Sequence, residues 1–212
     1  MSRLSEWLRK HKPKKLNRNN IRNLFQKIQI FWAFNVLSDK VEIAGKPNIN
    51  NPIIFKGKGE IKFSNNANFG GDASPDFYSY SYIEARNSNT EIEFGENFFS
   101  NNKLTIIAEG EGEEGGVKIG KDVIFGYRVS IVDSNFHDIN PQKRWCNKTK
   151  GANIKTGKVI IDDNVWVGSD SIILKGVHIG KNSIIAAGSI VTKSIPENVI
   201  AGGNPAKIIR NI

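Results

Sequence analysis

A repeat of six residues is the feature of this sequence that most limits its fold. Between residues 159 and 192 every sixth position is aliphatic and β-branched: Ile161, Val167, Ile173, Ile179, Ile185 and Val191. A helix repeats its apolar face about every 3.6 residues and a strand about every 2, so a strict six fits neither alone. It fits short strands joined by tight turns. The pattern therefore predicts a parallel β-helix, with aliphatic ladders inside a prism, in preference to an ordinary β-sandwich with regularly spaced strands.

The same phase recurs elsewhere in the chain, with interruptions. The first repeat starts near residue 41 and contains Ile43, Ile49, Phe55 and Ile61. It then slips by two residues, to Phe63 and Phe69. The pattern returns at Phe94, Ser100 and Ile106, and again at Ile119, Phe125 and Ile131. Residues 70–83 contain Pro75 and three tyrosines and are interpreted as a loop or irregular coil. Residues 133–158 are polar and lack the repeat. A long loop that leaves a rigid solenoid is usually functional.

These boundaries divide the chain into three parts. Residues 1–40 form a basic arm, in which 21–37 has helical spacing of apolar residues. Residues 41–195 form the β-helix, with an excursion loop at 133–158. Residues 196–212 form a C-terminal tail, and the stretch from Pro205 to Asn211 is expected to be a short helix.

The positive charge is concentrated in the arm. Ten of the 30 Lys and Arg residues lie in residues 1–40 with Glu6 and Asp39, so the arm carries +8 of the net +9. The body then gives no support to a nucleic-acid binder. Basic residues beside an apolar helical face suit an anionic membrane surface. The alternative is a helix that packs on the first coils or on a sister subunit, because open solenoid ends need caps.

Other features of the composition predict a cytoplasmic protein. One cysteine excludes an internal disulfide framework. No apolar run has the length of a membrane-spanning helix, and no small-residue cleavage site follows an apolar core. The acidic stretch 109–116 has no nearby His or Cys, so we interpret it as a solvated turn and predict no metal site.

His137 is the strongest candidate for catalysis. It stands where a coil ends and the long loop departs, near Asp133 and Asp138. Imidazole is the usual general base for a hydroxyl or amine, although a loop histidine with structural hydrogen bonds is the alternative. His11 lies in the arm, and His178 should point outward from a ladder. Cys146 shares the loop but has no partner visible in sequence, which disfavours a catalytic thiol.

The motifs in residues 98–210 resemble the left-handed β-helix, hexapeptide-repeat acyltransferases, and in particular their sugar O-acetyltransferase branch. The resemblance implies the left hand, a homotrimer, and acetyl-CoA bound in the groove between two prisms. It also implies that His137 is the general base toward an acceptor hydroxyl, which attacks the thioester directly, without an acyl-enzyme.

The resemblance extends to the binding residues. Asn101 would contact the acceptor beside His137, although a corner asparagine with a left-handed backbone is an equal alternative. Asp133, close to His137 in sequence, is a further candidate for acceptor binding. Trp166, whose neighbours Val165 and Val167 point inward, would be an exposed platform shared by acceptor and cofactor. The remaining cofactor positions run from the pantetheine arm to the CoA phosphates: Ser169, Ala187, Thr192, Lys193, Lys207 and Arg210. Lys207 stands where the family often has arginine, so the charge is kept but the bidentate fork is lost.

The predicted function is transfer of acetyl from acetyl-CoA to a sugar hydroxyl of a cell-surface glycan or its precursor. Residues 70–83 and the basic arm are absent from small galactoside-type enzymes and look more like acetyltransferases of capsule and lipopolysaccharide assembly, which leaves the acceptor open. One alternative is an N-acetyltransferase of a nucleotide-linked amino sugar, in which residues 70–83 could hold the nucleotide. The other is a non-catalytic β-helix scaffold, for which His137 and His178 are poorly placed as metal ligands.

Overall fold

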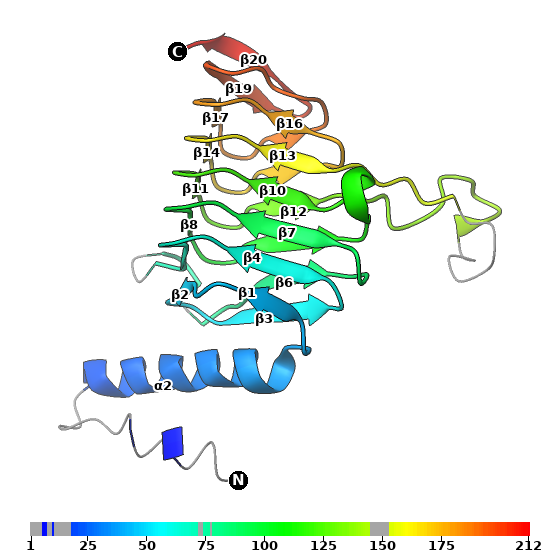
Figure 1. Ribbon diagram of the computed structural model, residues 1–212. Coiled ribbons are helices and arrows are strands. Elements are labelled where there is room, and N and C mark those ends of the chain that lie inside the picture. Colours follow the sequence, from blue (N-terminus) through cyan, green and yellow to red (C-terminus); the bar gives the residue numbers. More distant parts are fainter. Residues whose placement is uncertain (1–5, 8–9, 11–17, 72–73, 77, 145–152) are drawn as a thin grey trace.

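The chain winds into a three-sided parallel β-prism that stands on an N-terminal helix (Figure 1). This computed structural model describes residues 6–7, 10, 18–71, 74–76, 78–144 and 153–212. Successive strands enter three sheets in turn, so each strand from β1 to β19 pairs in parallel with a strand one coil away. The six-residue repeat therefore corresponds to one side of the prism, as the sequence predicts.

The sheets are named A, B and C in the order in which the chain first enters them. Sheet A contains β1 (Glu42–Ala44), β4 (Glu60–Phe63), β7 (Glu91–Phe94), β10 (Val117–Ile119), β13 (Val159–Ile161) and β16 (His178–Ile179). Sheet B contains β2 (Asn48–Ile49), β5 (Asn68–Phe69), β8 (Phe99–Ser100), β11 (Ile124–Phe125), β14 (Trp166–Val167), β17 (Ile184–Ile185), β19 (Val199–Gly203) and β20 (Ala206–Asn211). Sheet C contains β3 (Ile53–Gly57), β6 (Ser81–Ala85), β9 (Thr105–Ala108), β12 (Ser130–Val132), β15 (Ile172–Ile173) and β18 (Ile190–Val191).

The predicted ladder residues fill the core. From Phe55 to Val191 every one of them is buried, and the pairing places each above its counterpart in the next coil, as with Ile119 and Ile161. The early coils use phenylalanines, and the rings of Phe63 and Phe94 stack with centroids 5.0 Å apart. The slip of two residues is also confirmed, because Ile61 and Phe63 both point inward from β4. Residue 83, however, belongs to strand β6, so the irregular segment ends at residue 80.

The corner between sheets A and B is formed by residues with a left-handed backbone. Their φ angles lie between 56° and 62°: Asn66, Asn97, Asp122, Asn164, Asn182 and Asn198. Asparagine and aspartate tolerate this conformation better than other residues with a Cβ. Their side chains also bond from coil to coil, as from Asn97 Nδ2 to Asp122 Oδ1 at 2.9 Å. Polar side chains thus hold the turns of the prism in register.

Helix α2 (Arg18–Trp32) and the short π-helix η1 (Ala33–Leu37) lie across the end of the prism (Figure 1). The predicted helix at 21–37 is confirmed within the two. Gln26 joins α2 to the first coil, because its Nε2 donates to Asn50 O at 2.6 Å and to Asn51 Oδ1 at 2.8 Å. A 3-10 helix, η2 (Gly112–Glu114), forms the acidic turn.

The expected C-terminal helix is wrong. Residues 206–211 form strand β20, which runs antiparallel to β19, with Gly202 opposite Lys207 and Ile200 opposite Arg210. Strand β19 itself continues sheet B by pairing with β17, so the prism extends beyond residue 195. An open final strand would leave backbone groups unpaired, and the returning tail supplies partners for them. The Asn204–Pro205 pair is a turn signal, and Ile208 and Ile209 favour a strand.

Candidate functional site

The excursion loop leaves the corner between sheets C and A, after β12, and returns to β13 (Figure 1). Its two ends run side by side. Ser134 and Thr156 form an antiparallel bridge, and the N–H of Gly157 donates to Asp133 O at 2.8 Å. The described ends of the loop therefore have a fixed root on the rigid prism.

Asp133 holds this root to the acidic turn of the coil below. Its side chain is 0% exposed and accepts from three backbone amides, those of Glu109 at 2.7 Å, Gly110 at 2.9 Å and Gly116 at 2.7 Å. Burial raises the pKa of Asp133, and the three amide donors oppose that rise. The prediction that Asp133 contacts the acceptor stays a prediction, and these contacts favour a structural role.

A second set of contacts supports the turn before His137. Phe136 has a left-handed backbone, with φ of 56°, which is unusual for an aromatic residue. Its N–H donates to Ser134 Oγ at 2.9 Å, and Ser134 in turn donates to Glu109 Oε2 at 2.7 Å. The Arg86 guanidinium lies 5.0 Å from the Phe136 ring centroid. Because this conformation costs free energy, these contacts are needed to keep the direction of the chain at His137 fixed.

His137 itself is exposed, as a base that meets a bound acceptor must be. The neighbouring Asp138 is buried, and its carboxylate accepts from the N–H of Asn140 at 2.8 Å and of Asn153 at 2.9 Å. These amides hold the pKa of Asp138 below its usual value. The stability that this carboxylate contributes is therefore present at neutral pH and is lost as the pH falls through the lowered pKa. Asp138 thus holds the backbone of the excursion loop, whereas Asp133 holds that of the acidic turn.

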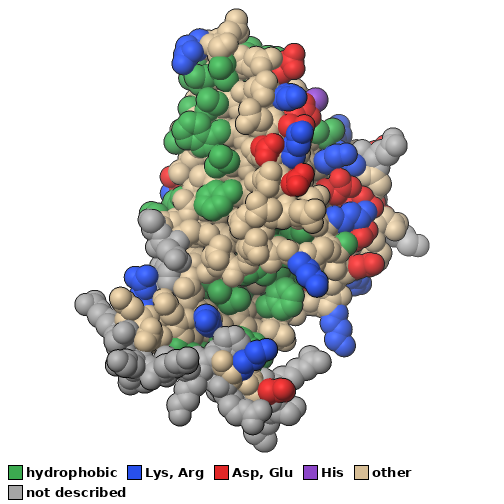
Figure 2. All heavy atoms as spheres, turned by 60° about the vertical axis from the view of Figure 1, so that its left-hand side comes forward, with side chains coloured by type: hydrophobic (Ala, Val, Ile, Leu, Met, Phe, Trp, Pro, Cys, Tyr) green, Lys and Arg blue, Asp and Glu red, His purple; other side chains and the backbone are tan. Residues whose placement is uncertain are grey.

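Trp166 lies on the outer face of sheet B with 52% of its surface exposed, which confirms the predicted outward orientation. It belongs to a strip of apolar residues that the register places one above another: Phe99, Ile124, Trp166, Ile184 and Ile200. Hydrophobic side chains are visible along this side of the molecule (Figure 2). The outer face of sheet A is charged instead, with Lys62 bonded to Glu60 and Glu91.

Asn101, Ser169 and Ala187 lie on different coils at the corner between sheets B and C. Ser169 Oγ accepts from the Tyr127 N–H at 3.1 Å, and its carbonyl accepts from the Gly188 N–H at 2.8 Å. Asn101 could have been a left-handed corner residue, but the positive φ at its turn belongs to Lys103. Its Oδ1 accepts from the Asn102 N–H at 3.0 Å, so the side chain is oriented by the backbone.

The described residues of the segment 70–80 lie beside Asn101 and Asn102. A Cβ on Gly71 would come within 3.3 Å of Asn101 Oδ1. Asn102 holds the segment by donating from Nδ2 to Pro75 O at 3.0 Å and accepting from the Gly71 N–H at 3.1 Å. Lys103 and Tyr127 both bind Asp76, and the Lys103 hydrogen bond is the main reason why the pKa of Asp76 lies below its usual value. The interruption in the repeat thus borders the predicted acceptor residue.

The other predicted cofactor residues are exposed near the C-terminal end of the prism. Thr192 and Lys193 follow β18 at the corner between sheets C and A. The loop that carries His137 departs from the same corner of an earlier coil, after β12. Lys207 and Arg210 lie on β20. Asn101, Ser169 and Ala187 are therefore separated from His137 and Lys193 by the width of sheet C. One side of six residues spans about 20 Å. One chain alone does not bring the predicted site residues together.

The remaining candidates are peripheral or lie outside the described residues. His178 is exposed on sheet A, with its Nε2 2.8 Å from Asp162 Oδ2. Cys146 and His11 fall outside the part of the chain that the structure describes. Within that part, no group of three or more His, Cys, Asp or Glu residues could hold a metal ion.

Sequence reasoning missed the apolar strip on sheet B and the support given by Arg86 and Glu109. The strip had a readable signal, because the residue immediately before the buried one is apolar in each sheet B strand from β8 to β19. The support from Arg86 and Glu109 had no signal in the sequence, because their contact with the loop depends on how residues from three coils are stacked.

Comparisons with known proteins agree with this architecture. Residues 158–193 match the family described as the hexapeptide repeat of succinyl-transferase. A galactoside O-acetyltransferase of Lactococcus lactis is 40% identical over 121 residues, which cover 57% of this chain and 53% of that protein. A putative lipopolysaccharide biosynthesis O-acetyl transferase of Escherichia coli is 32% identical over 139 residues, covering 56% of this chain and 71% of that protein.

Among solved structures, a galactoside acetyltransferase in complex with coenzyme A is similar at 25% identity with a TM-score of 0.52, and the match covers 98% of this chain and 90% of that one. In sequence, however, the chain spans about half the length of several of the curated relatives that it matches, from 53% to 57% of each.

Proposed function

The chain belongs to the hexapeptide-repeat acyltransferase family, and from this premise we propose that it is an acetyl-CoA-dependent O-acetyltransferase. Its acceptor is a sugar hydroxyl of a cell-surface polysaccharide or of its precursor. His137 is the general base. The proposal includes the left-handed winding that the family resemblance implies, and a cytoplasmic location.

The position of His137 carries this proposal. An exposed imidazole stands on a loop whose root is held by Asp133, Ser134 and Asp138, in a chain that is 40% identical to a galactoside O-acetyltransferase over 121 residues. A general base must be held at a fixed place relative to the proton that it removes. These contacts provide such a fixed place.

In the proposed reaction His137 takes the proton of the acceptor hydroxyl as its oxygen forms a bond to the acetyl carbonyl carbon. The carbon–sulfur bond of the thioester then breaks. The proton on His137 passes to the departing CoA sulfur, so the imidazole returns to its neutral form. The attack forms a tetrahedral intermediate whose oxyanion requires a hydrogen-bond donor. A backbone N–H at the edge of a coil is suited to this role.

The outer wall of the prism has the properties that acetyl-CoA requires. Trp166, with Ile124 and Ile184 beside it, offers an apolar surface for a pantetheine arm. Lys193, Lys207 and Arg210 are exposed cations at the C-terminal end, where charge would attract the CoA phosphates. The groups assigned to the cofactor by resemblance are thus chemically suited to its two ends.

Replacing Arg210 with alanine should raise the KM for acetyl-CoA several-fold at low salt and change kcat little, because the charge acts on the distant phosphates. Steady-state kinetics at two ionic strengths would measure this. Lys181→Ala, which removes an exposed cation from the corner between sheets A and B, is the matched control. An unchanged KM for Arg210→Ala at low salt would count against this phosphate site.

The proposed assembly is a homotrimer in which each site is formed by two chains. The separation of Ser169 and Asn101 from His137 by the width of sheet C supports this arrangement, because a neighbouring prism can bring one corner to the other. The apolar strip on sheet B supplies a contact surface, because its exposure to water is unfavourable. A closed ring uses two different surfaces of each chain, so we place the strip against sheet C of the neighbour and leave the charged sheet A outside the contact.

Replacing Ile124 with aspartate should then dissociate the trimer and abolish turnover, because a charge would be buried in an apolar contact. Sedimentation velocity or light scattering would show a species of one-chain mass. Ile160→Asp places the same charge on the outer face of sheet A, between Lys118 and His178, and should leave the assembly intact. The trimer proposal fails if both variants sediment like the wild type.

An N-acetyltransferase of a nucleotide-linked amino sugar is the second candidate. It is favoured by the position of residues 70–80 beside Asn101 and by the exposed Tyr80 in that segment, which could stack on a base. Incubation with labelled acetyl-CoA and a panel of glycans and sugar nucleotides would separate the candidates. An ester product is cleaved by mild alkali and an amide is not. If the protein transfers acetyl to no acceptor and does not bind CoA, the result would favour a non-catalytic scaffold.

A further inference from the structure

The apolar face of α2 is turned away from the prism. Gln26 of α2 and Ala33 of η1 are buried at the end of the prism, and the Phe34 ring of η1 meets that of Phe55 with centroids 5.8 Å apart. The larger apolar residues of α2 follow a helical spacing on the side of the helix opposite Gln26: Ile21, Leu24, Phe25, Ile28, Phe31 and Trp32. Of these, Ile21 and Phe25 are 50% exposed and Trp32 is 45% exposed. At the edge of this side the Phe25 ring contacts that of Tyr78, with centroids 5.7 Å apart. A helix that served only as a cap would be expected to place its apolar face on the core.

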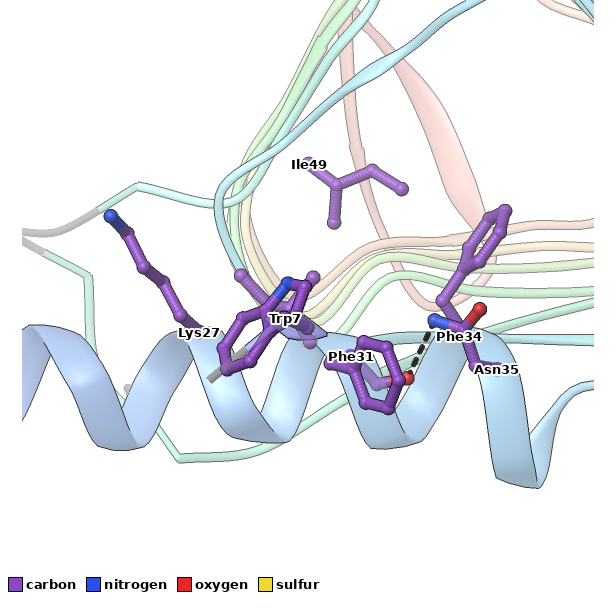
Figure 3. A pocket seen from close by; sticks show the side chains of 7 residues that line it. Trp7, Lys27, Phe31, Phe34, Asn35 and Ile49 are labelled. Carbon is purple, nitrogen blue, oxygen red and sulfur yellow. Dashed lines mark hydrogen bonds between the residues drawn. The ribbon is translucent and has the colours of Figure 1, made fainter. Parts of the chain in front are cut away.

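Aromatic residues and a lysine line a hollow on one side of this helix. Trp7, Phe31 and Phe34 form its apolar wall together with Ile49 of β2, so the hollow lies where the helical arm meets the first coil, and Lys27 lies at its edge (Figure 3). The rings of Trp7 and Phe31 are 5.3 Å apart. Such a combination of aromatic rings and a cation is typical of segments that lie at the boundary between lipid headgroups and acyl chains.

The charge around this end is positive. Lys10, Arg22, Lys27 and Lys40 are exposed on the arm, and Lys46 and Lys58 are exposed on the first coil. The arm as a whole carries +8 of the net charge of +9. In the described part of the chain no helix is both long and apolar enough to cross a bilayer. An interfacial contact therefore remains the way in which this surface would meet lipid.

We propose that the end of the molecule formed by α2 and the first coil is a docking surface for an anionic phospholipid bilayer. The helix lies across the axis of the prism (Figure 1), so it can rest along a flat surface with the prism upright. Ile21, Trp32 and Phe25 enter the interface, and Arg22 and Lys27 contact phosphate groups. In the homotrimer proposed above, three such arms would act together, because each arm bound raises the local concentration of the others.

Flotation with vesicles tests this surface with the full chain and without turnover. Vesicles of phosphatidylcholine with about a third phosphatidylglycerol should bind the protein at low salt, and pure phosphatidylcholine vesicles should bind it far less, because the surface potential is what attracts the cations. Arg22→Gln with Lys27→Gln should weaken binding about ten-fold or more, by the free energy of two basic residues at such a surface. Ile21→Ser with Trp32→Ser should weaken it at all salt concentrations.

Lys121→Gln with Lys181→Gln is the matched control, because it removes the same charge from exposed positions far from α2. Circular dichroism and CoA binding would show that each variant is folded. The proposal is overturned if anionic vesicles do not bind the wild type at low salt, if neutral vesicles bind it equally, or if the α2 variants behave like the control. Two other results would assign the surface to another partner and overturn the proposal, in each case with no protein bound to vesicles. One is that the α2 variants lose self-association, and the other is that they lose binding to an RNA oligonucleotide.

Discussion

Replacing His137 with alanine should lower kcat by about 10²–10⁴-fold, the usual loss when a general base is removed. The binding of CoA should persist, because the exposed cations and Trp166 do not depend on the imidazole. The measurement pairs single-turnover transfer to the best acceptor with calorimetric titration of CoA.

His178→Ala is the control for this experiment. His178 is also exposed and lies 2.8 Å from Asp162 Oδ2, but it is on the outer face of sheet A, one coil beyond the strand to which the loop returns. Its removal should leave transfer unchanged. The assignment of His137 is wrong if His137→Ala keeps a kcat near that of the wild type at neutral pH, or if it loses CoA binding in parallel with turnover.

Replacing Asp133 with alanine should lower the free energy of unfolding by about 2–4 kcal/mol. Three backbone amides would lose their acceptor, and a buried unsatisfied donor costs about 1–3 kcal/mol. Burial of the Asp133 carboxylate, which raises its pKa, itself costs free energy and reduces what the group contributes to stability. We therefore expect a loss smaller than the sum of the three amide costs. Chemical denaturation followed by circular dichroism would measure the change.

The same substitution should lower kcat, because the acidic turn and the loop root would no longer be joined beneath His137. Asp163→Ala is a suitable comparison, since Asp163 accepts from one exposed amide, that of Lys121 at 3.0 Å, and should cost little. A change in unfolding free energy of under about 1 kcal/mol for Asp133→Ala would contradict the structural role.

The fold was largely predictable because its period is local. Each hexad fixes which residue points inward, so ladder residues such as Ile119, Ile161 and Ile179 could be named from spacing alone, and all are buried. The departure of the loop at the end of β12 followed from the loss of the same period. The C-terminal helix was wrong because residues 206–211 take their structure from β19, a partner that local propensity does not include.

The candidate site was less predictable, because its geometry depends on contacts between coils. The position of His137 followed from the loop, and the exposure of Trp166 from alternation. The burial of Asp133 did not, since its three amide partners lie 17 to 24 residues away in sequence. Nor did the backbone at Asn101, because only the observed φ angles show that Lys103 takes the left-handed position at that turn.

The regular stacking of the coils sets a fixed height for the chemistry. Strands in sheet A step upward by about 4.8 Å each, and the loop root lies three to four steps above β1, so His137 would stand roughly 15–20 Å above the first coil. The thickness of α2 adds about 10 Å. With α2 resting on a bilayer, a hydroxyl on the first sugar of a glycolipid would be too close to the membrane to reach the imidazole, whereas a hydroxyl several sugar units along the chain would reach it. The number of coils below the loop would then select the position in the glycan that is acetylated.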